Sequence, residues 1–547
     1  MNWTLLFSDE RIRKSNPTTD LTRNAFESDF GRIIFSPALR RMHDKTQVFP
    51  LTADDNIHSR LTHSNEVMSI GYTLGVKLCY NETIQAKTKK SSEELLRIIP
   101  LILKNICLIH DIGNAPFGHF GETIVSNYFK ELEKKNNEFF GKLNDHQKRD
   151  FINYDGNAQG LRVLTKLQIL DDAYGLNLTF ATLAAYLKYP NFEEINDNVE
   201  KGLNEIGELL EDGTIEKSKH GVFESETTYF ERIMKACDLK KEGRYLRHPL
   251  CYLMEAADSI AYLTMDMEDG FYKGLFNLVY VKNKFKKLNT KLGKYIIETC
   301  ENKLLNKTSK IVNIRIALID HLVNFTYNKF IQEVQGIENG SYNKEILKDD
   351  PDNVADILSK ICFEKVFIAR EINYLESTGH SVFTGLLNYY IEFLFHHDKK
   401  VRKRAKSLIS NSIINCAIEE NLEKIFKHKI PIKISKLEAG KISFKKHQSK
   451  IDSIQTEILK LTKDNERVEI LLPEFIKLSK KQELNPIPNE EKTRLSKIKK
   501  ELTKIVDPNF DDLDNYYKFR VILDFISGMT DQYALNHFQK ISGQKIN

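Results

Sequence analysis

Apolar residues recur at helical spacing through most of this chain of 547 residues. In residues 59–80 one helical stripe is formed by His63, Val67, Ile70, Leu74 and Leu78. Residues 93–111 and 249–268 carry the same pattern. Pro100 marks either a kink in the second segment or its true start. Strand-like alternation is rare, with residues 277–281 as one short candidate. The sequence therefore predicts a mostly α-helical fold, an all-α bundle with helical additions.

Changes in composition along the chain indicate four parts. We expect a core over residues 1–280, a helical continuation over 281–429, and a C-terminal helical segment over 507–547 that returns to the core. The Lys- and Glu-rich residues 430–506 have the composition of an insertion, and the polar residues 191–221 that of a surface insertion within the core. No internal repeat is visible.

Charge, cysteine content and hydropathy exclude several classes of protein. Lysine and arginine number 81 against 76 aspartate and glutamate residues, and a net charge of +5 does not indicate a nucleic-acid-binding protein. The seven cysteines form no Cys-x-x-Cys pair, which predicts reduced thiols. The most apolar stretch, residues 95–110, contains Arg97, Pro100 and Lys104 and is shorter than the about 20 residues that cross a bilayer. Expecting no signal peptide, we predict a soluble, cytoplasmic protein with no membrane partner.

Two histidines and two aspartates form a candidate metal site. His110 and Asp111 are adjacent at the end of a predicted helix. His63 and Asp258 lie on apolar faces of two other predicted helices. A buried carboxylate needs a partner, and a divalent cation balances two carboxylates and two neutral imidazoles. Such mixed nitrogen and oxygen ligands suit Mn²⁺, Fe²⁺, Co²⁺, Ni²⁺ or Zn²⁺, and Mg²⁺ less well. Taken singly, each residue could instead be a hydrogen-bonded core histidine, a helix cap or part of an ion pair.

The segments around these residues resemble one enzyme family. The order His, His-Asp, Asp resembles the metal site of the HD-domain phosphohydrolases, and the longer blocks resemble the bacterial deoxyguanosinetriphosphate triphosphohydrolases. Residues 280–510 do not show such a resemblance. The matching blocks are RRMHDKTQVF at 40–49, RLTHS at 60–64, HDIGNAPFGHFGE at 110–122, DGNAQG at 155–160, LKYP at 187–190 and FISGMTD at 525–531.

The resemblance implies an α-helical HD domain that holds a divalent metal, Mn²⁺ or Mg²⁺ first, and hydrolyses dGTP or other dNTPs. The products would be a deoxynucleoside and inorganic triphosphate. His119 and Glu122 lie three residues apart and can face one another, and the resemblance implies that this pair promotes attack on the α-phosphorus beside the metal. Asn114 occupies the place of a second catalytic histidine in animal dNTP hydrolases, which leaves His119 and Glu122 as the expected acting pair. The alternative is that His119 only caps a turn.

Several positions resemble the contacts that this family makes with the deoxyribose. Tyr262 and Asp266 lie four and eight residues after Asp258, on the same helix face. The resemblance implies that Tyr262 stacks against or bonds the sugar and that Asp266 binds its 3′-hydroxyl. Gln47 and Val48 resemble residues that border the sugar and exclude a 2′-hydroxyl. Each could instead be an ordinary packing or surface residue.

Other positions resemble phosphate contacts, because a triphosphate with roughly four negative charges needs converging basic residues. Arg60 lies one helical turn before His63 and is expected at the α-phosphate. Lys188 is expected at the outer phosphates, and Asn157 at another polar part of the substrate. Arg520 is a weaker candidate for a phosphate contact.

Two alternatives remain open at this point. The same site could act on another nucleotide, such as a different dNTP or a guanine-nucleotide alarmone. The chain could also be a sensor that responds to a nucleotide effector or to single-stranded DNA, because residues 399–406 are strongly basic and residues 430–506 are Lys-rich. The triplet His396-His397-Asp398 is expected to be a helix end. The family resemblance also implies a homo-oligomer, expected to be a hexamer.

Overall fold

The structure is a computed structural model, and part of the chain is described in it. It describes residues 1–13, 22–49, 57–168, 174–193, 195, 218–241, 243–424, 488–505 and 510–545, with single positions between 471 and 478. Most of the predicted insertions at 191–221 and 430–506 lies outside the described residues. The chain divides into two compact units, residues 1–390 with 526–547, and residues 391–525. The four parts expected from the sequence stay a prediction.

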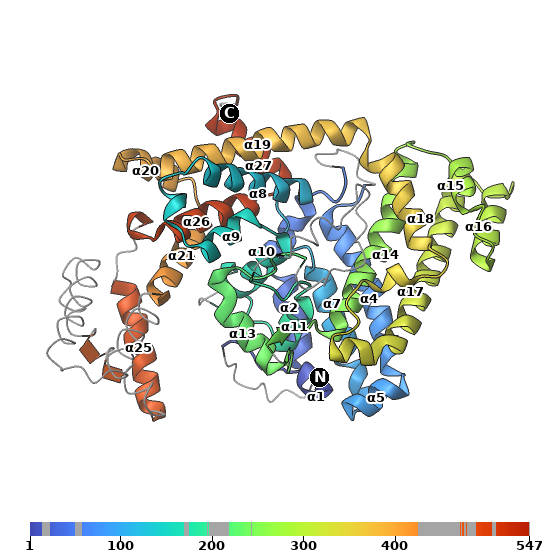
Figure 1. Ribbon diagram of the computed structural model, residues 1–547, viewed down its shortest axis with the longest axis horizontal. Helices are drawn as coiled ribbons and strands as arrows, with labels where there is room; N and C mark the ends of the chain where they lie inside the picture. The colour runs from blue at the N-terminus through green and yellow to red at the C-terminus, as the bar shows by residue number, and fades with distance from the viewer. Residues whose placement is uncertain are drawn as a thin grey trace. The chain divides into compact units, whose positions relative to one another are not determined.

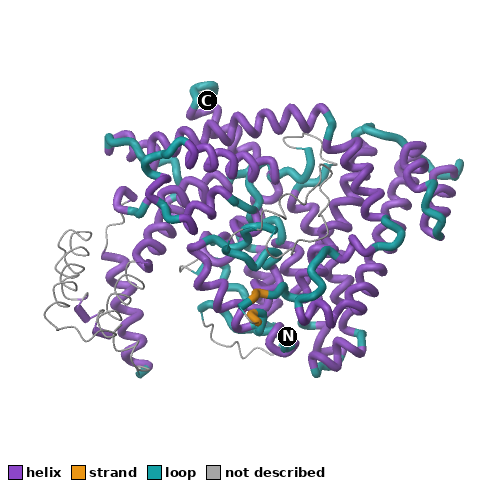
Figure 2. The backbone as a smooth tube through the Cα atoms, in the orientation of Figure 1, coloured by secondary structure: helices purple, strands orange, loops and turns teal. Residues whose placement is uncertain are grey.

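Helices make up nearly all of the regular structure in the described residues (Figure 2). The first unit contains α1 (Trp3–Leu6), α2 (Ala25–Ile34), α3 (Pro37–Arg41), η1 (Met42–Asp44), α4 (Arg60–Cys79), α5 (Glu82–Thr88), α6 (Ser92–Leu96), α7 (Ile99–Ile109), α8 (Gly118–Lys134), η2 (Phe140–Lys142), α9 (Asp145–Ile152), α10 (Gly156–Arg162), η3 (Val163–Leu167), α11 (Phe180–Tyr186), η5 (Glu224–Glu226), α13 (Thr227–Ala236), α14 (Pro249–Tyr272), α15 (Leu278–Phe285), α16 (Lys291–Glu301), α17 (Lys307–Asn339), η6 (Ile346–Asp349), α18 (Val354–Ile361), η7 (Cys362–Phe367), α19 (Arg370–Leu394) and α27 (Asp531–Ile541).

The second unit is also helical. Its elements are the end of α19 from Ile391, then α20 (Lys399–Lys406), α21 (Asn411–Lys424), α25 (Asn489–Ile505), η9 (Phe510–Asp512) and α26 (Asn515–Ser527) up to Phe525; the last two residues of α26 belong to the first unit. The described strands are β1 (Lys240–Lys241) and β2 (Arg244–Tyr245), which pair antiparallel in the first unit. The predicted all-α fold class is confirmed.

Helices α4, α7 and α14 pack against one another at the centre of the first unit, and α17 packs along α14 (Figure 1). The sequence permits the close approach of α4 to α7 through two glycines. A Cβ atom on Gly71 would lie 2.4 Å from Sγ of Cys107, and one on Gly75 would lie 2.8 Å from Cα of Pro100. Any side chain at these positions would push the two helices apart, and with them the residues that each helix carries.

The helices expected from the apolar pattern are present with revised ends. Ser59 caps α4 by accepting the N–H of Thr62, so the helix over 59–80 is confirmed. The segment 93–111 forms two helices, α6 and α7. Pro100 stands in the first turn of α7 and so marks the start of that helix, because a proline there removes no intrahelical bond.

The strand expected at 277–281 is wrong. Asn277 instead caps α15 by accepting the N–H of Tyr280, and the helix buries Val281 and Phe285 on one face. The apolar run is short enough to suit either structure, and the cap with the four-residue spacing of the buried pair favours the helix. None of the described helices combines the length and the apolar content needed to cross a membrane. The seven cysteines, all described, form no disulfide.

Candidate metal centre and active site

Three helices bring the predicted metal ligands together. His63 lies in α4, His110 and Asp111 follow the last turn of α7, and Asp258 lies in α14. One ligand atom from each of His63, His110 and Asp111 lies within 4.8 Å of the other two. Oδ1 of Asp258 lies 3.0 Å from Nε2 of His63 and 3.3 Å from Nε2 of His110. Four side chains from remote parts of the sequence therefore converge.

The orientation of His110 suits a metal ligand. Its Nδ1–H donates to the carbonyl oxygen of Cys107 at 2.7 Å, and its buried Nε2 has no hydrogen-bond partner among the described residues. A hydrogen bond of this kind fixes the ring and leaves its other nitrogen for a metal. Burial lowers the pKa of His110, but the carboxylates of Asp111 and Asp258 outweigh it and raise that pKa to about 9. This concentration of negative charge fits a bound divalent cation.

Both aspartates of the cluster remain anionic despite their burial. Burial raises the pKa of Asp111, but Arg60 and His110 overcome this effect and bring the pKa to about 2. The Arg60 guanidinium bonds Oδ2 of Asp111, and Nδ2 of Asn114 donates to its Oδ1 at 2.8 Å. The pKa of Asp258 is also held well below its usual range, against the effect of burial, by the two histidines. Arg60, the predicted α-phosphate contact, thus adjoins the metal ligands.

His119 and Glu122 form a hydrogen-bonded pair in the first turn of α8. Nδ1 of His119 lies 3.1 Å from Oε2 of Glu122, and the His119 side chain is 73% exposed whereas that of Glu122 is 8% exposed. Gly156 at the start of α10 approaches this pair so closely that a Cβ there would lie 2.5 Å from Oε1 of Glu122. A buried carboxylate that fixes one nitrogen of an accessible imidazole leaves the other nitrogen for proton transfer.

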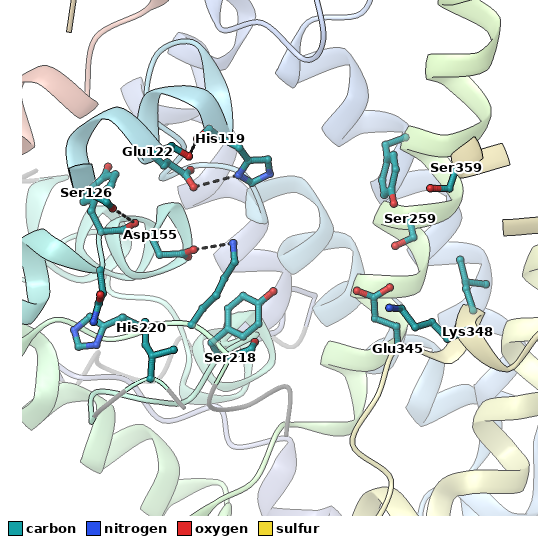
Figure 3. A pocket seen from close by; sticks show the side chains of 18 of the residues that line it. His119, Glu122, Ser126, Asp155, Ser218, His220, Ser259, Glu345, Lys348 and Ser359 are labelled. Atoms are coloured by element: carbon teal, nitrogen blue, oxygen red, sulfur yellow. Dashed lines mark hydrogen bonds and ion pairs between the residues drawn. The ribbon is translucent and has the colours of Figure 1, made fainter. Parts of the chain in front are cut away.

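A cavity of about 600 Å³ opens beside this pair. This volume lies within the roughly 300–1,000 Å³ typical of small-molecule sites. Tyr262 also lines the cavity, four residues after the metal-cluster residue Asp258. Figure 3 shows His119 and Glu122 on one wall and Glu345 on the opposite wall. The cavity therefore links the candidate catalytic pair to the helix that carries part of the metal cluster.

Lysines and carboxylates line the cavity in equal number, and the acidic residues are Glu122, Asp155, Glu345 and Asp356. Lys219 lies 2.9 Å from Oδ2 of Asp155 and 5.6 Å from the ring centre of Tyr189. The carboxylate of Asp155 raises the pKa of Lys219 above its ordinary value. Lys219 was not among the predicted residues because it stands near the end of the polar segment 191–221. The apolar Val222 and Phe223, three and four residues after it, were the available signal and are buried. The lysines that line the cavity are Lys130, Lys219, Lys348 and Lys360.

The remaining predicted substrate contacts do not line this cavity. Lys188 lies 3.2 Å from Oε1 of Glu255. The backbone N–H and the side-chain amide of Asn157 both donate to Asp155 at 2.8 Å. Burial raises the pKa of Asp266 well above its usual range. The predicted contacts that are absent from the described lining are Gln47, Val48, Arg60, Asn157, Lys188 and Asp266, and their roles stay predictions.

Two lesser candidates have structural roles. Arg520 is fully buried in the second unit, where its guanidinium donates to Asp524 at 3.0 Å, so the suggestion that it reaches phosphate is not supported. Asp398 caps α20 by accepting the N–H of Lys400 at 2.8 Å, and the rings of His396 and His397 stack on each other. The expectation of a helix end at this triplet is confirmed.

Comparison with known proteins agrees with this arrangement. The family model of the phosphohydrolase-associated domain matches residues 493–540. A deoxyguanosinetriphosphate triphosphohydrolase-like protein of Listeria monocytogenes is 32% identical over 442 residues, which cover 76% of this chain and 90% of the relative. A protein of the same name from Pseudomonas aeruginosa is 33% identical and covers 71% of this chain and 85% of the relative.

A further relative extends over almost the whole length. The deoxyguanosinetriphosphate triphosphohydrolase of an Enterobacter species is 26% identical, with 99% of this chain and 97% of the relative covered. The two relatives at 32% and 33% identity cover more than two thirds of the chain. The chain therefore belongs to the deoxyguanosinetriphosphate triphosphohydrolase family of HD-domain phosphohydrolases.

Proposed function

We propose that this protein is a metal-dependent dNTP triphosphohydrolase that prefers dGTP and cleaves the bond between the α-phosphorus and O5′. Water would add to the α-phosphorus, and the products would be deoxyguanosine and intact inorganic triphosphate. The relatives named for this activity support hydrolysis of a dNTP by the family. Such an enzyme would lower the cellular dNTP pool. The expected cytoplasmic location and homo-oligomer, including the hexamer, stay predictions.

The observation that carries the proposal is the convergence of His63, His110, Asp111 and Asp258, together with a substrate-sized cavity that is lined by Ser259 and Tyr262 of the helix that carries Asp258. These residues would hold one divalent ion, with Mn²⁺ or Mg²⁺ as the first candidates. When bound, such an ion supplies Lewis-acid polarisation of a phosphoryl oxygen.

The side chains beside the cluster have complementary tasks. Glu122 fixes His119 through Nδ1, so Nε2 of His119 can take the proton from the attacking water. Arg60, which pairs with Asp111, would bind an α-phosphate oxygen. The lysines of the cavity wall, Lys219 first among them, would neutralise the outer phosphates, and Tyr262 would pack against the sugar.

Product analysis tests the proposal directly. The purified protein would be incubated with dGTP and Mn²⁺ or Mg²⁺, and the products would be separated by anion-exchange chromatography. We expect deoxyguanosine and triphosphate in equal amounts. Formation of dGMP with pyrophosphate, or no product with the metal bound, would refute the proposal. A panel of dNTPs and guanine-nucleotide alarmones in the same assay decides the substrate preference.

Two variants connect the activity to the site. His63→Ala removes one ligand and should abolish hydrolysis, whereas His43→Ala, at a histidine whose side chain is 74% exposed, should keep it. Equal activity of both variants would show that the cluster does not carry the reaction.

A second candidate function rests on α20. Its side chains Lys399, Lys400, Lys403 and Arg404 are exposed, which suits an anionic effector such as single-stranded DNA or a nucleotide. A sensor of this kind would bind single-stranded DNA in a salt-dependent way, and His63→Ala would keep that binding. Fluorescence anisotropy with a labelled single-stranded oligonucleotide measures this binding. Absence of binding at low salt would refute the sensor hypothesis.

A further inference from the structure

The carboxylate of Asp531 joins two segments that flank the metal cluster. Its Oδ2 accepts the backbone N–H of Thr46 at 3.0 Å, and its Oδ1 accepts the backbone N–H of Phe117 at 2.9 Å. Asp531 is 2% exposed and begins α27, more than 400 positions after both partners. Two backbone N–H groups, of which that of Phe117 is buried, thus depend on one remote side chain.

The side-chain nitrogen of Lys45 forms a second link between the same parts of the chain. It donates to the carbonyl oxygens of Asn114 and of Ser527, the latter at 3.0 Å, and it is 4% exposed. The carbonyl oxygen of Lys45 itself accepts the N–H of Arg60 at 2.9 Å. Lys45 and Asp531 therefore connect the start of α4, the loop after α7 and the C-terminal block.

The loop after α7 needs such support because of its backbone conformation. Phe117 has φ +60° and Gly118 has φ +62°, and non-glycine residues rarely adopt the left-handed region. Phe117 also stands at the N-cap of α8 without a side-chain cap of its own. The bond from Phe117 to Asp531 therefore fixes the point at which α8 begins. His119 is the second residue of that helix, directly after Gly118.

Both ends of this loop carry residues of the candidate site. Asp111 precedes it and takes a hydrogen bond from Asn114, whose carbonyl oxygen is held by Lys45. His119 follows it in the first turn of α8. A displacement of about 1 Å at a reacting group can lower a rate by roughly 100-fold, so the position of this loop matters for turnover.

We infer that Asp531 and Lys45 are positioning residues that clamp the loop between Asp111 and His119 in its reactive geometry. Asp531 lies in the segment that matches the phosphohydrolase-associated domain, so the inference assigns that segment a task in the active site. The expected effect on turnover rests on the proposed function. The support that Asp531 and Lys45 give to the loop can be measured without substrate, by hydrogen exchange.

The test uses the full-length protein with Asp531→Asn and Lys45→Met. An asparagine offers one oxygen and so keeps one of the two N–H bonds, and the methionine keeps the aliphatic stem of Lys45 without its donors. We expect kcat for dGTP to fall about tenfold or more while KM changes far less, because the substrate contacts remain. Hydrogen exchange followed by mass spectrometry should show faster exchange in peptides that contain Thr46 and Phe117, with α14 and α17 unchanged.

Asp29→Asn is the matched control. Asp29 is also a fully buried carboxylate that joins remote segments, since it accepts the N–H of Thr179 at 3.0 Å and pairs with Arg11 at 2.6 Å. This variant should lower the melting temperature without a selective loss of kcat. A similar kcat in Asp531→Asn and the wild type, or a loss that the control shares at equal destabilisation, would overturn the inference.

The exchange measurement separates the two hypotheses. If the wild-type protein shows no dNTP hydrolysis, the proposed function fails, and the local exchange around Thr46 and Phe117 still decides whether the clamp exists. Unchanged exchange in both Asp531→Asn and Lys45→Met would overturn the clamp even in an active enzyme. If one of the two variants does not fold, hydrogen exchange in the other variant still tests the same connection between the loop and the C-terminal segment.

Discussion

Nε2 of His63 lies 3.0 Å from Oδ1 of Asp258, although 195 positions separate the two residues in the chain. The pair joins α4 to α14, and His110 reaches the same carboxylate oxygen at 3.3 Å. This contact places two imidazoles and a carboxylate around one point inside the first unit. The ligands meet at that point only in the folded chain. An ion that binds there should therefore stabilise the folded protein.

Metal addition should therefore raise the melting temperature of the wild-type protein. A ligand at about 100 times its Kd that binds only the folded state adds about 2.7 kcal/mol to stability. Differential scanning fluorimetry with a Mn²⁺ or Mg²⁺ titration measures the shift. We expect His63→Ala to lose most of it, while His43→Ala keeps it. A shift of the same size in His63→Ala would place the stabilising ion elsewhere.

Gly156→Ala should impair both turnover and stability. The added Cβ would lie 2.4 Å from Oδ1 of Asn114 and 2.5 Å from Oε1 of Glu122, and both of these side chains are buried. The two side chains must move, and a shift of Glu122 disturbs His119. We expect kcat to fall by about tenfold, with a destabilisation of about 1–3 kcal/mol from overpacking. Steady-state kinetics and thermal melts measure the two effects.

Gly141→Ala provides the control for this substitution. A Cβ at Gly141 would meet nothing within 4 Å, and the residue lies in η2 at the surface. This variant should keep wild-type kcat and melt within a few degrees of the wild type. Equal kcat for Gly156→Ala and Gly141→Ala would mean that Glu122 does not need its present position.

Lys219→Met should weaken the binding of the triphosphate part of the substrate. Lys219 lines the cavity and is oriented by Asp155 at 2.9 Å. Loss of one charge-assisted contact to phosphate costs about 1.5–3 kcal/mol, so KM for dGTP should rise by about tenfold or more. Inhibition by inorganic triphosphate should weaken in parallel. Lys142→Met, at an exposed lysine paired with Glu138, should change neither value; an unchanged KM in Lys219→Met would exclude this lysine from the phosphate site.

The metal cluster could be predicted because its parts carry local signals. His63 interrupts an apolar stripe, Asp258 does the same on another helix, and the His110-Asp111 pair precedes a glycine. Periodicity placed both helices correctly, and the family resemblance grouped the four residues. Distances such as that between Asp258 and His110 follow only from the packing of α4, α7 and α14.

Other features depend on contacts that no local pattern encodes. The run from Leu278 to Val281 has strand-forming side chains, and its helix became evident only through the cap at Asn277. The cavity wall draws Lys219 and Lys348 from segments far apart in the sequence. Asp531 belongs to a recognisable C-terminal block, but its bonds to Thr46 and Phe117 need the folded chain.

The stability of the protein should depend on pH through His58. Nδ1 of His58 lies 2.9 Å from Asp269, and Nε2 lies 3.0 Å from Glu66. Burial lowers the pKa of His58, but the two carboxylates outweigh it and raise that pKa to about 10, against 6.5 for a free histidine. Because the folded-state pKa is the higher one, this stabilisation is fully present below about pH 6.5 and is lost as the pH rises to about 10.

The wild-type melting temperature should therefore fall between about pH 7 and pH 10, and His58→Gln should flatten that fall. Glutamine can bond one carboxylate but has no charge to lose over this range. Thermal melts from pH 6 to 10 at constant ionic strength measure the difference between the two curves, and the exposed His43→Gln serves as the control. Parallel curves for the wild type and His58→Gln would mean that this histidine does not remain protonated in the folded protein at neutral pH.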